Sequence, residues 1–143
     1  MTGIDIQAHA AAILGLLRAV GPDLTVYPPE DPDDTGHVVP DGADPPYVAV
    51  HIRPGFGLAG RLADATTNAV FDITCHCVGG NDIAARAVAQ MVVDALLDVE
   101  PVIPGRQSRP IRYLDSPPAR PDESTGRLVV DQTYVFRLET LPG

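Results

Sequence analysis

Alternation of apolar and polar residues predicts a long strand near the end of the chain, from Arg127 to Glu139. Leu128, Val130, Tyr134, Phe136 and Leu138 fall on one face, while Arg127, Asp131, Thr133, Arg137 and Glu139 fall on the other. At about 3.3 Å per residue this strand would span roughly 40 Å, enough to project beyond a small domain. Shorter segments of the same kind predict four further strands, at 24–27, 47–52, 69–78 and 110–115.

Two other segments repeat their apolar residues every three or four positions, the pattern of an amphipathic helix. The first follows a capping box at Thr2–Asp5 and stops at Gly21-Pro22, and the second starts at Asn81 or Asp82 and ends before Pro101. The predicted buried stripes are Ile6, Ala10, Ile13, Leu17 and Val20 in the first helix, and Ile83, Ala87, Val88, Met91, Val92, Ala95 and Leu96 in the second.

The resulting order, α-β-β-β-α-β-β, predicts an α+β fold: a mainly antiparallel sheet of about five strands with two helices packed on one face. The strands at 47–52 and 69–78 should form a hairpin. We expect one domain, residues 1–143, with long loops near 28–46 and 53–68 and an extended arm near 105–127.

The arm is the part of the chain that most strongly suggests a partner. Its proline-rich link around 116–121 has little apolar surface to bury, so it must lie in water or along another molecule. The chain has ten arginines, no lysine and nineteen acidic residues, giving a net charge of −9. Residues 1–100 carry −10 of this charge and residues 101–143 carry +1, which favours a head-to-tail contact between copies.

The predicted contact joins arginines around the arm to acidic residues of a neighbouring copy. The candidates are Arg106, Arg109, Arg112, Arg120 and Arg127 on one side, and Glu30, Asp31, Asp33 and Asp34 on the other. Heterologous contacts of this kind close into rings. The alternative interpretation is a set of solvated surface charges, which contribute little energy.

Motifs for catalysis or metal binding are weak. Gly55–Gly60 spells G-x-G-x-x-G, but no crossover helix follows, so a flexible hairpin tip is favoured over a cofactor loop. In Cys75-His76-Cys77 the histidine should face away from both thiols, which argues against a zinc site. The acidic segment Glu30–Gly36 has Gly42 where a calcium loop needs its bidentate acid. We expect no enzymatic activity, no cofactor and no bound metal.

The net charge and the apolar pattern of the chain restrict the locations and the partners that we expect for the protein. A net charge of −9 argues against nonspecific nucleic-acid binding. No apolar run approaches the roughly 20 residues of a membrane-spanning helix. The first residues also lack the basic start and the apolar segment of a secretory signal. We expect the protein inside a cell or in a particle assembled there, without membrane contact.

In the order and spacing of its elements the chain resembles the small tail-terminator proteins of long-tailed bacteriophages. The segments that carry the resemblance are the opening helix, Val26-Tyr27 with the proline-rich loop after it, Pro46–Val50, Phe71–Cys77, the helix from Ile83 to Leu97, and Tyr134–Leu138. The resemblance implies a hexameric ring on the head-proximal end of the tail tube, which stops tube polymerisation and joins the head connector.

The implied partners are further copies of the chain, the tail tube protein and the head–tail connector or stopper protein. DNA would pass through the lumen without specific binding. The implied location is the neck of the virion, after assembly in the host cytoplasm, and no catalytic residue carries over.

Other hypotheses stay open. One is a small ligand-binding or enzymatic domain that uses the Gly55–Gly60 loop and the histidines. Another is a head-side stopper or adaptor protein of the same neck, and a third is a host-encoded interaction module.

Overall fold

The computed structural model describes residues 4–29, 39, 43–54, 68–116, 120–122 and 129–143. Two helices and seven strands follow one another along these residues. They are α1 (Ile6–Arg18), β1 (Val26–Tyr27), β2 (Tyr47–Pro54), β3 (Ala69–Gly79), α2 (Asp82–Leu96), β4 (Arg106–Ser108), β5 (Arg112–Asp115), β6 (Arg120–Asp122) and β7 (Val129–Pro142).

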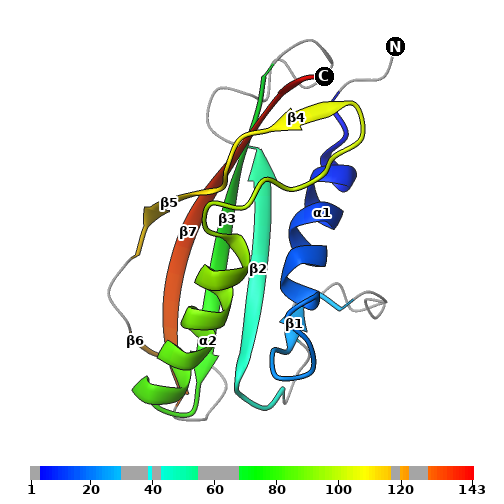
Figure 1. Cartoon of the computed structure of the whole chain (residues 1–143). Coiled ribbons are helices and arrows are strands. Elements are labelled where there is room, and N and C mark those ends of the chain that lie inside the picture. Colours follow the sequence, from blue (N-terminus) through cyan, green and yellow to red (C-terminus); the bar gives the residue numbers. More distant parts are fainter. Residues whose placement is uncertain (1–3, 30–38, 40–42, 55–67, 117–119, 123–128) are drawn as a thin grey trace.

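The strands form one sheet, and both helices pack on the same face of it (Figure 1). The order is β1-β2-β3-β7, and β4, β5 and β6 follow one another along the outer edge of β7. Only β1 pairs in parallel, with β2, and every other pairing is antiparallel. The predicted α+β fold is therefore confirmed, including the hairpin of β2 and β3.

The central strand β3 follows the predicted alternation. Phe71, Ile73, Cys75 and Cys77 have no exposed surface and belong to the apolar interior between sheet and helices. Their neighbours in the sequence point to the opposite face, which we call the open face. Apolar residues from the segment before β2 cover one end of the open face, where Val39 and Ala43 pack against Tyr47, Ala49 and Val78.

The helices differ from the prediction at their first turns. The Asp5 carboxylate caps α1 by accepting the Ala8 backbone N–H at 3.0 Å, so the helix begins later than a cap at Thr2 would place it. Ile6 then lies in the first turn and is 38% exposed, while His9 takes a buried position between Asp5 and Ile13. In α2, Asn81 is the cap and Ile83 is 73% exposed.

The predicted arm requires a correction for the residues that the structure describes. Three short strands of the segment 105–127 pair with β7 of the same chain instead of projecting from it (Figure 1). The physical reason is that the outer edge of β7 presents backbone N–H and C=O groups that need partners. The strand predicted at 110–115 is present as β5, whereas β4 and β6 were not predicted.

Several predicted features lie outside the described residues. They are the acidic candidates Glu30, Asp31, Asp33 and Asp34, the Gly55–Gly60 loop, the prolines at 117 and 118, and Arg127.

Candidate functional site

Arg106, the first of the predicted partner-binding arginines, forms hydrogen bonds within its own chain. Its guanidinium is half-buried and donates to Thr140, from Nε to the hydroxyl Oγ1 at 3.2 Å and from Nη2 to the carbonyl oxygen at 3.0 Å. These bonds join β4 to the last residues of β7. Arg106 therefore contributes to the fold and is poorly placed to reach a neighbouring copy.

The Thr140 hydroxyl also belongs to a buried network of hydrogen bonds that includes His9. His9 Nδ1 lies 2.6 Å from the Asp5 carbonyl oxygen, which can only accept, so Nδ1 carries the proton. Nε2, 2.9 Å from Thr140 Oγ1, then accepts the hydroxyl proton of Thr140, while the same oxygen accepts from Arg106. The imidazole also stacks on Phe71, with ring centroids 4.5 Å apart. When His9 is neutral, each donor in this hydrogen-bond network meets an acceptor.

This arrangement predicts that the protein loses stability in mild acid. Burial lowers the pKa of His9 below its usual 6.5, and the charge of Arg106 acts in the same direction, against the hydrogen bond to Asp5. Below pH 6.5 the unfolded chain takes up a proton that the folded chain resists. The free energy of unfolding should therefore be highest above that pH and fall as the pH decreases, as denaturant unfolding would measure.

The matched variant for this prediction is His9→Gln, which removes the titrating group. Its slope of stability against pH should be smaller than that of the wild type between about pH 5.5 and 7.5. The His51→Gln variant corrects for the second histidine with a lowered pKa. Equal slopes in the wild type and His9→Gln would contradict the role given to His9.

The remaining predicted arginines are placed differently from one another. The Arg109 side chain is 58% exposed, and its Nε lies 3.7 Å from Glu139 Oε1. Arg112 is exposed on β5, in register with Arg137 of β7. Arg120 lies in β6. Arg109 and Arg112 therefore stay candidates for contact with another molecule.

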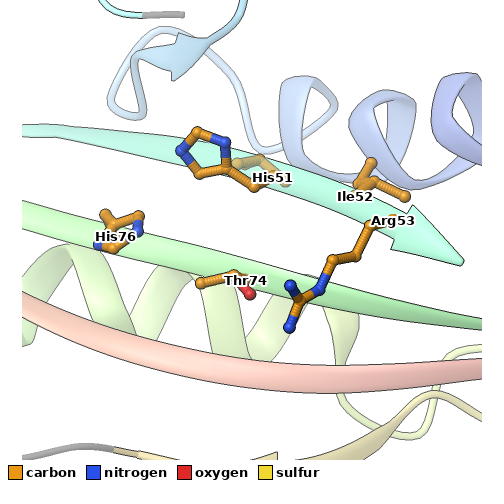
Figure 2. A pocket seen from close by; sticks show the side chains of 6 residues that line it. His51, Ile52, Arg53, Thr74 and His76 are labelled. Carbon is orange, nitrogen blue, oxygen red and sulfur yellow. The ribbon is translucent and has the colours of Figure 1, made fainter. Parts of the chain in front are cut away.

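A polar cluster that the sequence analysis did not identify occupies the open face of the sheet. A pocket of about 630 Å³ is lined by Val50, His51, Ile52, Arg53, Thr74 and His76. Figure 2 shows His51 and Arg53 of β2 with Thr74 and His76 of β3, all on the same side of the two strands. The pairing of His51 with Thr74 and of Ala49 with His76 brings these side chains together.

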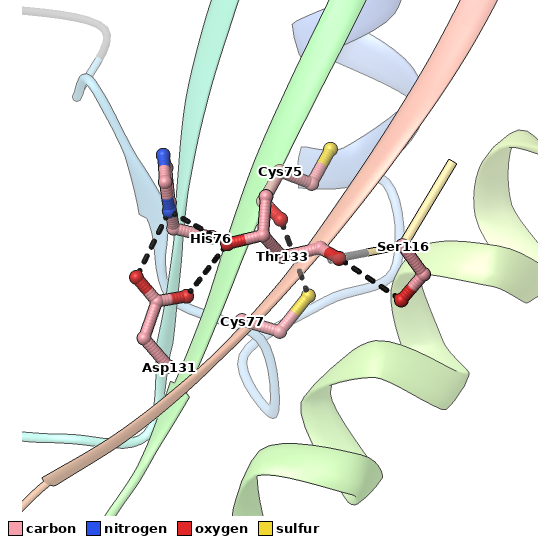
Figure 3. Close-up of polar contacts among 6 residues, drawn as sticks. All are labelled: Cys75, His76, Cys77, Ser116, Asp131 and Thr133. Carbon is pink, nitrogen blue, oxygen red and sulfur yellow. Dashed lines mark hydrogen bonds and ion pairs between the residues drawn. The ribbon is translucent and has the colours of Figure 1, made fainter. Parts of the chain in front are cut away.

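Asp131 and Thr133 of β7 hold His76 in place (Figure 3). His76 Nδ1 donates to Asp131 Oδ2 at 2.9 Å and lies 3.2 Å from Thr133 Oγ1. The Thr133 hydroxyl donates to the other carboxylate oxygen of Asp131, at 3.2 Å. The position of the His76 ring is thus fixed by two side chains of the neighbouring strand.

His51 meets the His76 ring edge to face, with centroids 5.5 Å apart and an angle of 86° between the planes. Burial lowers the pKa of His51, and the nearby His76 lowers it further. At neutral pH His51 is therefore mainly uncharged. Protonation would convert both of its ring nitrogens to donors.

The two cysteines lie on the other side of the sheet from His76, as the alternation predicts. Burial raises the pKa of the Cys75 thiol to about 12. Burial also raises the pKa of the Cys77 thiol, with smaller contributions from Cys75 and Asp131. Both thiols stay protonated at neutral pH, and a protonated thiol is a poor nucleophile and a poor metal ligand.

The described residues contain neither a cluster suited to a metal ion nor a helix that could cross a membrane. No group of three or more His, Cys, Asp or Glu side chains in that part of the chain is arranged to hold a metal ion. Neither described helix has the length and apolar character needed to cross a membrane.

A signal for the open-face cluster was present in the sequence. His51 and Arg53 alternate with Val50 and Ile52, which is the pattern of a shared polar face. The strand predicted from the sequence ends at Ile52, however, which leaves Arg53 in the predicted loop. With β2 extended to Pro54, the hairpin with β3 places Arg53 beside the histidines.

No protein-family model matches the sequence, and no curated protein matches it either. Among solved structures, a chain in the virion of a native gene transfer agent (GTA) particle is similar, with a TM-score of 0.61 and 21% sequence identity. The similarity covers 93% of this chain and 93% of that chain. The two chains therefore share one fold over nearly their whole lengths.

Proposed function

We propose that this chain is a structural protein of a virion and that it acts as a tail terminator. In this role a ring of identical copies, six by the family resemblance, caps the head-proximal end of the tail tube. The ring stops tube polymerisation and joins the tail to the head connector. The observation that carries the proposal is the fold shared with a chain of the GTA virion over 93% of both chains.

The surface next to β5 supports a contact between copies. Tyr113 and Leu114 are 49% and 46% exposed, and the exposed Arg112 precedes them. Arg109 lies shortly before them in the chain, with most of its side chain in solvent. This combination of apolar and positively charged side chains suits a partner that offers carboxylates, and residues 1–100 of a second copy carry a charge of −10.

The electrostatics also agree with a passage for DNA. A ring of copies that each carry a charge of −9 has little affinity for phosphates over most of its surface. DNA can then move through the lumen without being retained.

The proposal is tested by assembling tail tubes in the presence of this protein, using the tube protein encoded by the same genome. Electron microscopy should show a cap at one end of each tube and a limited range of tube lengths. Tubes that grow without control, with no cap at either end, would rule out the terminator role.

A double substitution, Arg109→Glu and Arg112→Glu, tests the surface next to β5. It should reduce the fraction of ring in solution or on tubes, because it places acids where the neighbouring copy is expected to present acids. Arg86→Glu, on the exposed side of α2, is the matched control and should leave the ring intact. Equal loss of ring in both variants would contradict the assignment of the interface.

A further inference from the structure

We propose that the pocket on the open face of the sheet binds a single phosphate group, free or within the backbone of a nucleic acid. Arg53, Thr74 and His51 are the residues that would bind it. This site is separate from the proposed contact surface at β5, and its test does not depend on ring formation.

The first argument is the placement of the three side chains. His51 and Thr74 are direct partners in the antiparallel pairing of β2 and β3, and Arg53 follows two residues later on the same face of β2. Figure 2 shows the Arg53 side chain extending across the sheet toward Thr74. One guanidinium, one hydroxyl and two imidazoles, those of His51 and His76, therefore line the same pocket.

The second argument is the balance of charge around the pocket. Asp72, in register with Arg53, accepts a hydrogen bond from Arg137 Nε at 3.0 Å. Asp131 is bound to His76 at 2.9 Å. These two acids, which the described residues place on this part of the face, are thus engaged by other side chains. Arg53 is exposed and has no ion pair among the residues that the structure describes, so its charge is available to an anion.

The third argument concerns the kind of anion. A guanidinium presents several N–H donors in a planar fork that matches the oxygens of phosphate. The Thr74 hydroxyl adds a donor from the neighbouring strand, and a protonated His51 adds another. A phosphate group has enough oxygens to accept from all three side chains, whereas a carboxylate has only two.

The experiment is a titration of the whole protein with inorganic phosphate, followed by NMR at the ring protons of His51 and the amide and methyl signals of Thr74. We expect shifts that saturate and that are centred on this pocket. Arg53→Gln should weaken the affinity about tenfold, as loss of a charge-assisted hydrogen bond does. Arg86→Gln makes the same change of net charge on α2, away from the open face, and should leave the affinity unchanged.

Two further probes distinguish the source of the phosphate group. A short DNA duplex that shifts the same signals more strongly than inorganic phosphate would assign the site to the nucleic-acid backbone. Saturation by inorganic phosphate with no response to the duplex would assign it to a free anion. Acetate that binds as tightly as phosphate would overturn the assignment, because the site would then suit the carboxylates of another protein.

A pH series with sulfate, whose charge is constant in this range, tests His51. Among the described residues, the charged and titratable groups around it on this face are Arg53, Asp72, His76, Asp131 and Arg137. Sulfate should bind more tightly as the pH falls and His51 becomes protonated, and His51→Gln should remove this dependence. Shifts that do not saturate, or that are the same in Arg53→Gln, would overturn the site while leaving the tail-terminator proposal untouched.

Discussion

Replacement of Phe136 by alanine should lower the free energy of unfolding by about 3–5 kcal/mol. Phe136 has no exposed surface and belongs to the main core cluster. Its strand β7 is paired on both sides, with Ile73 of β3 opposite Phe136 on one side and Tyr113 of β5 on the other. The sheet therefore cannot close around the cavity that alanine would leave. Denaturant unfolding followed by circular dichroism measures the loss.

The control for this substitution is an apolar side chain outside the core. Ile83 is 73% exposed in the first turn of α2, so Ile83→Ala should change the stability by no more than about 0.5 kcal/mol. If Phe136→Ala is no more destabilising than Ile83→Ala, the position of the core between helices and sheet is wrong.

Local patterns in the sequence were sufficient to predict the elements of the core. The strict alternation from Phe71 to Cys77 has one physical solution, a strand with one face against the helices, and the structure confirms it. The stripe of α2 was correct in part: Val88, Val92 and Leu96 are buried and Met91 and Ala95 half-buried, but Ile83 and Ala87 are exposed. These predictions depend only on the period of the backbone, which the sequence shows directly.

The structure departs from the prediction where distant segments meet. The alternation within each segment does not indicate that β4, β5 and β6 lie along β7, because their pairing depends on residues elsewhere in the chain, from Val129, 7 residues after Asp122, to Pro142, 36 residues after Arg106. The proline-rich segment was interpreted as surface for a partner because its own composition offers little to bury. Backbone hydrogen bonds to β7, which composition does not reveal, hold its described parts on the sheet.

The candidate site was missed for a related reason. The arginines were selected by their clustering in the sequence, but Arg106 is bound to Thr140 and Arg109 lies near Glu139 of its own chain. The open-face pocket combines residues from two strands, and its cluster of polar contacts extends to a third. Only the register between strands shows that Arg53 and Thr74 face the same space.

The second large effect is expected from Thr140→Val, which should cost about 1–3 kcal/mol although the side chain keeps its shape. Valine would leave His9 Nε2 without its donor in a fully buried position and Arg106 Nε without its acceptor. Arg106 Nη2 would keep its bond to the Thr140 carbonyl, because the substitution does not change the backbone. Equilibrium unfolding near pH 7.5 measures the effect while His9 is neutral.

Thr74→Val provides the matched comparison, since it also removes a threonine hydroxyl, in this case from the open face of the same sheet. The Thr74 hydroxyl has no hydrogen-bond partner in the described part of the chain, so its loss should change the stability by about 0.5 kcal/mol or less. A large difference between the two variants would show that the His9–Thr140–Arg106 contact joins α1, β7 and β4 energetically. Equal effects would mean that Thr140 contributes only its β-branched shape to the strand, and that its hydroxyl could be exchanged for a methyl group without penalty.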